Sequence, residues 1–210
     1  MTEREPEPEV TQELFSDEVA LRRVRHFVAQ LAEQGETRGL IGPLELPRIW
    51  SRHILNSALL APLVRPGRVG DVGTGAGLPG LVLAIARPDA EFVLIEPMAR
   101  RVEWLEEQVS ELGLDNVTVV RGRAEDTLEF RALDQVTARA VSALRTLIPL
   151  TARLVRPGGE LLLLKGAAVE TEIEAARKVI AKWKLENIRV EQLGLDIDVE
   201  PTRVFRADVR

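Results

Sequence analysis

The sequence predicts an α/β fold with a seven-stranded sheet, in which strands one to five are parallel and an antiparallel pair closes the chain after a set of N-terminal helices. From residue 68 onward, short apolar runs alternate with helical patterns, which is typical of βαβ units. The last two β-like segments have no helical pattern between them, so we expect them to pair antiparallel. A glycine-rich stretch at residues 69–80 joins the first expected strand to a helix, and together these features indicate a Rossmann-like architecture.

The expected strands and helices follow one another in a regular order. The strands cover residues 69–72, 92–96, 117–120, 134–140, 160–165, 185–193 and 202–209, and the helices between them cover residues 78–86, 98–112, 144–154 and 169–183. The fifth strand follows a Pro-Gly-Gly turn and is apolar at consecutive positions, which predicts burial on both faces of the sheet.

The chain divides by charge and pattern into three parts. Seven acidic residues and one arginine give residues 1–18 a charge of −6, so the remainder carries +1 of the total of −5. We expect residues 1–15 to form a disordered acidic tail, because alternating Glu and Pro cannot bury apolar area. Residues 16–66 are expected to be a helical extension, and residues 67–210 the main domain, forming one compact unit with the extension.

Two helices are expected in the extension. The first carries Leu21, Val24, Val28 and Leu31 on one stripe. The second runs from residue 47 to about residue 61, with Trp50, Ile54, Ala58 and Ala61 on its buried face. Arg48, Arg52 and His53 lie away from that face. They are either a solvated surface, or residues that contact RNA or brace a loop.

The composition excludes several classes of mechanism. The chain has no Cys and no Tyr, so it has no disulfide, thiol nucleophile or phenolic acid. No run of about 18 or more apolar residues marks a membrane span, and the N-terminus carries Glu where a secretory signal carries basic residues. We therefore expect a cytoplasmic protein with no metal and no membrane partner. The oligomeric state is open, with a monomer favoured.

The glycine-rich stretch is the main candidate for a ligand site. Gly73, Gly75 and Gly77 leave the main chain open to close approach by a ligand. Gly75, Gly77 and Gly80 also satisfy the G-x-G-x-x-G pattern of dinucleotide-binding enzymes. The glycines alone therefore allow either S-adenosylmethionine or a nicotinamide dinucleotide.

Acidic residues after neighbouring strands bear on this choice. Asp71 suits a cationic ligand such as a sulfonium and would repel a pyrophosphate, although it could also cap the amides of the loop. Glu96 ends the second strand, where a carboxylate accepts hydrogen bonds from ribose hydroxyls. Glu125 follows the third strand and either meets the adenine edge or caps the next turn.

The end of the chain favours a methyltransferase. A dehydrogenase needs a substrate domain and a proton donor, whereas this sequence supplies only a helix and a β-hairpin after the fifth strand. The expected architecture is therefore that of a class I S-adenosylmethionine-dependent methyltransferase. Without a Cys nucleophile, and with no Asn/Asp-Pro-Pro-aromatic loop at residues 137–143, a ring nitrogen such as guanine N7 suits the available residues. A binding module without chemistry and a nicotinamide-dependent oxidoreductase are the alternatives.

Several motifs carry a family resemblance. The segments are Arg52-His-Ile-Leu-Asn-Ser57, Asp71-Val-Gly-Thr-Gly-Ala-Gly-Leu-Pro-Gly80, Arg121-Gly-Arg-Ala-Glu125, Ala138-Arg-Ala-Val-Ser142 and Leu164-Lys-Gly166. Their order and spacing resemble the bacterial ribosomal RNA small-subunit methyltransferase G family, also called glucose-inhibited division protein B. Asn56 departs from the commonest family pattern, which has Asp there, as does the long acidic tail.

The resemblance implies methylation of guanine N7 in the 530 loop of 16S ribosomal RNA, with S-adenosylmethionine as cofactor. It also implies that the cofactor site contains Gly73, Leu78, Ala124, Glu125 and Arg139, to which the residue patterns add Asp71, Gly75, Gly77 and Glu96. The candidates for RNA binding are Arg52, His53, Arg123 and Lys165. No catalytic residue is assigned. Lys165 and Arg139 are candidates for aligning the substrate, and Arg139 contacts either cofactor or RNA phosphate. Whether the substrate is naked RNA or an assembled subunit stays open.

Overall fold

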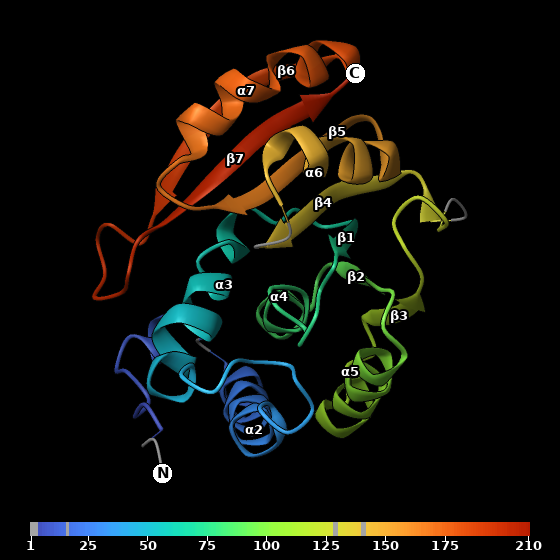
Figure 1. The fold of residues 1–210 in the computed structure, drawn as a ribbon. Helices are drawn as coiled ribbons and strands as arrows, with labels where there is room; N and C mark the ends of the chain where they lie inside the picture. Colours follow the sequence, from blue (N-terminus) through green and yellow to red (C-terminus); the bar gives the residue numbers. More distant parts are fainter. Residues whose placement is uncertain (1–3, 16, 128–129, 140–141) are drawn as a thin grey trace.

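The computed structural model describes residues 4–15, 17–127, 130–139 and 142–210. Seven strands form one sheet in the order β3-β2-β1-β4-β5-β7-β6 (Figure 1). The strands are β1 Arg68–Val72, β2 Glu91–Glu96, β3 Val117–Arg121, β4 Leu133–Arg139, β5 Val155–Lys165, β6 Leu185–Leu193 and β7 Thr202–Val209. Strands β1 to β5 pair parallel, and β7 pairs antiparallel with both β5 and β6. The predicted fold class is confirmed. Ala140, the expected last residue of the fourth strand, lies outside the described residues.

The strand order reverses between β1 and β4. The chain moves from β1 to β2 and β3 on one side, then returns to place β4 on the other side of β1. Asp71 of β1 is in register with Leu94 of β2 and with Thr137 of β4. Ligands of open α/β sheets bind at such a reversal, outside the carboxyl ends of the strands.

Helices cover the two faces of the sheet (Figure 1). Their bounds are α2 Glu18–Gln34, α3 Asn56–Ala58, α4 Gly80–Ala86, α5 Ala99–Leu112, α6 Leu144–Thr151 and α7 Val169–Lys182. The core on one face joins residues of α2, α4 and α5 to the sheet, and the core on the other joins residues of α6 and α7. Burial of large apolar side chains such as Trp104 and Phe27, both 0% exposed, stabilises the fold by about 1.5–3 kcal/mol each.

Strand β5 is longer than the sequence predicts. The Pro157-Gly158-Gly159 turn lies inside this strand and interrupts its regular pairing with β4. Leu133 pairs with Val155, whereas Gln135 pairs with Glu160, so β5 has extra residues between the two pairs. From Glu160 to Leu164 the strand is buried, as expected for a strand covered on both faces.

The N-terminal segment differs from the expected disordered tail. Residues Thr11–Leu14 form the short helix α1, and Val10, Thr11 and Phe15 are at most 6% exposed. The Glu5 carboxylate accepts hydrogen bonds from the Trp50 and Ser51 amides at 2.8 and 3.0 Å. The Glu/Pro pattern predicts a solvated segment and takes no account of Val10 and Phe15. Burial of these two apolar side chains holds the segment against the helices.

The second expected helix also differs. It divides into a 3-10 turn at Leu46–Arg48, a π-helix at Ile49–Leu55 and the short α3, before a further 3-10 turn at Ala61–Leu63. Trp50, Ile54 and Ala58 are buried as expected. His53, expected on the outer side, is only 9% exposed, because the i→i+5 hydrogen bonds of a π-helix change the direction of successive side chains.

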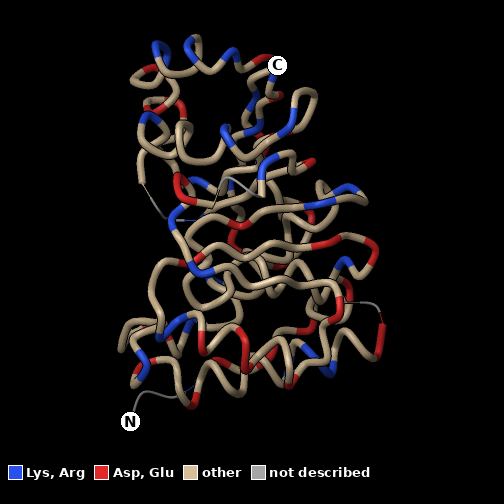
Figure 2. The backbone as a smooth tube through the Cα atoms, turned by 90° about the vertical axis from the view of Figure 1, so that its right-hand side faces the viewer, with Lys and Arg blue, Asp and Glu red and all other residues tan. Residues whose placement is uncertain are grey.

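Acidic and basic residues are interspersed over the whole backbone (Figure 2). This agrees with a near-neutral body once the acidic N-terminal segment is set apart. In the described part of the chain, no helix combines the length and apolarity required to cross a bilayer.

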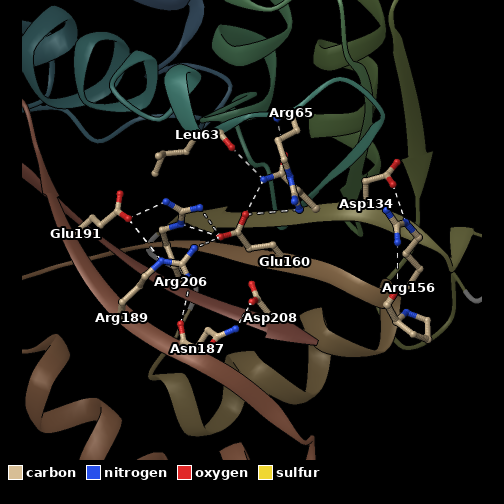
Figure 3. Close-up of polar contacts among 12 residues, drawn as sticks. Leu63, Arg65, Asp134, Arg156, Glu160, Asn187, Arg189, Glu191, Arg206 and Asp208 are labelled. Atoms are coloured by element: carbon tan, nitrogen blue, oxygen red, sulfur yellow. Dashed lines mark hydrogen bonds and ion pairs between the residues drawn. The ribbon is translucent and has the colours of Figure 1, made fainter. Parts of the chain in front are cut away.

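A buried carboxylate fixes the C-terminal hairpin to the amino ends of the parallel strands (Figure 3). Glu160 is 2% exposed, and its Oε1 accepts hydrogen bonds from Arg189 and Arg206 at 2.8 Å each. Its Oε2 accepts from the Gln135 side chain at 3.0 Å and lies 3.7 Å from Arg65. A buried charge requires such partners, since its desolvation costs several kcal/mol. The network therefore joins β4, β5, β6 and β7 at the end of the sheet opposite the carboxyl ends of the parallel strands.

Candidate active site

A cavity of about 770 Å³ opens at the carboxyl ends of β1, β4 and β5, within the range of about 300–1,000 Å³ typical of small-molecule sites. The glycine loop that follows β1 forms one wall, and Arg139 and Lys165 at the ends of β4 and β5 form the next. Residues from the segment 40–56 and from the turn into β7, residues 200–203, complete the lining. The cavity lies at the end of the sheet where the sequence analysis expects the site.

The glycines of the loop have two different roles. Gly73, Gly75 and Gly77 have φ values of 69°, 60° and 99°, which side chains rarely adopt. A Cβ at Gly75 would meet nothing closer than the Gly73 oxygen at 3.9 Å, so the main chain there is open to the cavity. A Cβ at Gly77 or Gly80 would instead collide with Leu81 or Leu94 at 2.3 Å. Gly75 therefore admits a ligand, whereas Gly77 and Gly80 allow the helix to pack.

Glu96 fastens the loop to the end of β2. Its Oε2 accepts a hydrogen bond from the Gly75 amide, and its Oε1 accepts one from the Met98 amide, both at 3.0 Å. The residue is 2% exposed. The Arg101 guanidinium lies 3.9 Å from Glu96 and 4.0 Å from the position of a Gly75 Cβ. Arg101 lines the cavity, whereas Glu96 does not.

Asp71 lies behind the loop, where it caps an amide. It is 0% exposed, and its Oδ2 accepts a hydrogen bond from the Gly80 amide at 2.8 Å. This is the capping alternative that the sequence left open beside direct contact with a cation. Burial raises the pKa of Asp71 to about 6, against the opposing effects of the nearby Thr74 side chain, of the hydrogen bond from the Gly80 amide and of the Arg139 charge.

Three of the expected residues lie outside the cavity lining, in the turn that follows β3. Ala124 is buried, Glu125 is half-buried and Arg123 is exposed, all in the turn after β3. Gly77, Asp71 and Glu96 are also set back from the cavity, whereas Gly73, Gly75, Leu78 and Arg139 line it. The structure therefore brings together only part of the expected cofactor set.

Arg139 is held by the π-helix. One of its Nη atoms donates to the Arg52 carbonyl oxygen and the other lies 3.1 Å from His53 Nδ1. His53 Nε2 in turn lies 2.7 Å from a Glu45 carboxylate oxygen. Burial lowers the pKa of Arg139 to about 10, and the negative charge of Asp71 opposes this. Arg139 thus remains a cation at neutral pH, in contact with the helix that carries two of the RNA candidates.

Lys165 is paired rather than extended into solvent. Its Nζ lies 2.7 Å from Glu172 of α7 and donates to the Ser142 carbonyl oxygen at 2.9 Å. The side chain is 9% exposed, yet it still borders the cavity with Arg52 and His53. Of the RNA candidates, Arg123 alone does not line the cavity.

Sequence reasoning missed several lining residues. Arg101, Glu45, Thr74 and Arg203 all border the cavity. Thr74 lies inside the glycine motif and Arg101 follows Glu96 by five positions, so proximity to those motifs was the available signal. Glu45 and Arg203 offered none, because they reach the site only through the folding of distant segments. Asn56, the departure from the family pattern, also borders the cavity.

The residues of the site fit S-adenosylmethionine. Two buried polar atoms of residues that line the cavity have no hydrogen-bond partner within the part of the chain that the structure describes, namely Thr74 Oγ1 and Arg101 Nε. Buried polar groups normally have partners, and the amino and carboxylate groups of a methionine moiety would supply them. The open main chain at Gly75, whose amide Glu96 holds from behind, suits the adenosine half.

Solved structures share this architecture. A SAM-dependent O-methyltransferase from Thermotoga maritima superimposes with a TM-score of 0.61 at 15% identity, over 88% of this chain and 71% of its own. TYW2 from M. jannaschii, in complex with AdoMet, gives a TM-score of 0.61 at 19% identity, over 77% of this chain and 78% of its own. At such low identity this similarity shows the fold alone, which is that of the class I methyltransferases.

Sequence comparison identifies the family. The family model described as rRNA small subunit methyltransferase G matches residues 20–198. The ribosomal RNA small subunit methyltransferase G of Leifsonia xyli subsp. xyli is 65% identical over 206 residues, which are 98% of each chain. Its counterpart from Clavibacter michiganensis subsp. michiganensis is 62% identical over 98% of this chain and 96% of its own. The chain therefore belongs to the rRNA small subunit methyltransferase G family.

Proposed function

We propose that this protein transfers a methyl group from S-adenosylmethionine to N7 of a guanine in the 530 loop of 16S ribosomal RNA, in the cytoplasm. The observation that carries the proposal is the cavity at the strand reversal. It joins the ligand-accessible main chain of Gly75 to the cationic side chains of Arg52, Arg139 and Lys165. A cofactor and an anionic polymer can therefore meet in one place.

The proposed chemistry requires positioning more than proton transfer. When bound, S-adenosylmethionine supplies an electrophilic methyl group. Guanine N7 carries a free lone pair and no proton, so its attack on that methyl group needs no general base. As the bond from N7 to the methyl carbon forms, the bond from sulfur to that carbon breaks, and the positive charge passes from sulfur to the base. The chain's part is to align the two atoms, which accounts for a large share of the rate in such reactions.

The proposed division assigns residues inside and beside the cavity to the two ligands. We assign Gly73, Gly75, Leu78 and Glu96 to the cofactor, with Ala124 and Glu125 at its adenine end. Arg52 and Lys165 contact RNA phosphate at the mouth of the cavity, and Arg123 extends this contact beyond β3. Asp71 acts through the loop that it caps, and Arg139 lies between the two ligands.

The reaction is tested by mapping the methyl group. Purified protein is incubated with methyl-labelled S-adenosylmethionine and either small ribosomal subunits or naked 16S RNA. We expect label at N7 of one guanine in the 530 loop, and the two RNA forms identify the substrate. Label on a base amine, on another region or on protein would overturn the proposal. A parallel titration with S-adenosylhomocysteine and NADH should show binding of the former only.

Lys165 provides a test of the proposed RNA contact. Lys165→Ala should reduce methylation by about 10- to 100-fold, because it removes one charged hydrogen bond, while affinity for S-adenosylhomocysteine stays unchanged in calorimetry. The matched variant Glu172→Gln keeps an acceptor for the Leu144 amide, which Glu172 now serves at 2.9 Å, but releases the ammonium. It should therefore retain methylation. Equal loss in both variants would show that Lys165 only ties α7 to residues 142–144.

A further inference from the structure

A chain of three polar side chains connects the segment before the π-helix to the end of β4. Glu45 lies 2.7 Å from His53 Nε2, and His53 Nδ1 lies 3.1 Å from an Arg139 Nη atom. His53 is 9% exposed, and Arg139 and Glu45 are half-buried. All three border the cavity. The contacts are therefore partly shielded from water, which strengthens them.

The chemistry of the partners dictates the state of the imidazole. A guanidinium has donors only, so His53 Nδ1 must present a lone pair to Arg139. A neutral imidazole then carries its proton on Nε2, where it donates to the Glu45 carboxylate. The direction of donation is the same along the chain, from Arg139 to His53 and from His53 to Glu45. This leaves a single tautomer that satisfies both contacts.

We propose that His53 is a positioning residue that acts through Arg139: its neutral Nε2-protonated form, oriented by Glu45, fixes the Arg139 guanidinium in the active-site cavity. The Arg52 carbonyl oxygen holds the other Nη atom at 3.1 Å. The π-helix thus grips Arg139 at two points, through consecutive residues. Local π-helical geometry is frequent at functional sites, and here it turns His53 inward.

The charges around His53 support a neutral ring. Arg139 faces it from β4, with Asp71 of β1 behind Arg139, while Glu45 faces it from the preceding loop and Arg52 from its own helix. Burial lowers the pKa of His53, and the Arg139 and Arg52 charges act in the same direction against the opposing effect of Glu45. Protonation at acidic pH would put a second N–H donor and a second cation against Arg139. It would therefore displace the guanidinium.

The tautomer can be read directly by NMR, independently of the proposed reaction. The chain has only two histidines, and the exposed His26 is 3.1 Å from Glu111 on another surface. In ¹⁵N-histidine-labelled protein, two-bond correlation spectra at neutral pH should show His53 neutral and protonated at Nε2 alone. His26→Gln assigns the signals. A His53 ring that is protonated at Nδ1, or charged, at neutral pH would overturn the inference.

Two substitutions separate positioning from simple packing. Asparagine places its oxygen where Nδ1 stands and can still accept from Arg139, whereas glutamine reaches only the Nε2 position. His53→Gln should lower kcat/KM for RNA methylation, or affinity for S-adenosylhomocysteine, by about 100-fold, the scale of an error near 1 Å in placement. His53→Asn should keep most of the wild-type value. Because asparagine does not titrate, its activity should also lack the fall at acidic pH that protonation of His53 causes in the wild type. His26→Gln should behave as the wild type.

A double mutant links the effect to Arg139. If His53 acts through Arg139, His53→Gln should add no further loss in an Arg139→Ala background, since paired residues are not additive. Additive losses, or equal behaviour of the Asn and Gln variants at unchanged melting temperature, would overturn the inference. The activity readout rests on the proposed function. If the wild type methylates no RNA, that function fails, while the tautomer and the S-adenosylhomocysteine titrations still decide the role of His53.

Discussion

Replacing Glu96 with alanine should abolish measurable binding of S-adenosylmethionine and with it all methyl transfer. The carboxylate holds the Gly75 and Met98 amides at 3.0 Å and is 2% exposed. Leaving a buried donor without an acceptor costs about 1–3 kcal/mol for each group. The loop would therefore lose its shape, and the proposed ribose hydroxyls would lose their acceptor. Affinity should fall by at least about 100-fold on the same energy scale.

Two variants control this experiment, which is read by calorimetry with S-adenosylhomocysteine. Glu91 begins the same strand with an exposed side chain at the opposite end, so Glu91→Ala should bind normally. Arg101→Ala removes the guanidinium that stands 3.9 Å from Glu96 and should weaken binding far less. Tight binding by Glu96→Ala would end the assignment of Glu96 to the cofactor.

The parts of the fold that follow from local pattern could be predicted from the sequence. The hairpin formed by β6 and β7 has the expected bounds, because two β-like runs without a helix between them can only pair antiparallel. The glycine loop could also be located from local sequence, since Gly75 and its neighbours act through their own main chain. The choice between cofactors was not local. It depended mainly on the end of the chain, which supplies a helix and a β-hairpin in place of a substrate domain. Asp71 was a weaker indication, and it caps the Gly80 amide nine residues later.

The remaining parts depend on contacts between distant segments. The N-terminal segment reads as a solvated acidic tail until Glu5 meets the amides of Trp50 and Ser51, more than forty residues away. The π-helix likewise has an α-helical apolar pattern, so its inward His53 could not be predicted from periodicity. Lys165 reads as a strand-end lysine exposed to substrate, yet its ammonium pairs with Glu172 seven positions later. In each case the role of the residue depends on a hydrogen-bonding partner whose separation along the sequence follows no fixed rule.

Asp71→Asn should make the protein more stable at neutral and alkaline pH while impairing its function. Burial raises the pKa of Asp71 from 3.8 to about 6, so the folded state disfavours the charged form. The contribution of this group to stability is fully present below pH 3.8 and is lost as the pH rises through about 6. Above that pH the ionised carboxylate lowers the free energy of unfolding by up to about 3 kcal/mol. Asparagine avoids this loss, since it has no charge and can still accept from the Gly80 amide.

Denaturant unfolding of both proteins from below pH 3.8 to pH 8 measures the effect. The variant should gain most at pH 8 and less at pH 5, and the two curves should converge only below pH 3.8. Asp134→Asn is the control of opposite sign, because the Arg68 amide and then Arg156 lower the pKa of that carboxylate. Its stabilising effect is present at neutral pH and lost in acid, so this variant should be less stable at pH 8. Cofactor affinity of Asp71→Asn should nevertheless fall, because Arg139 loses the buried negative charge that balances it. If Asp71→Asn is more stable but binds the cofactor less well, the charge of Asp71 serves binding and not the fold. If the variant is instead less stable than the wild type at pH 8, the ionised form of Asp71 supports the loop.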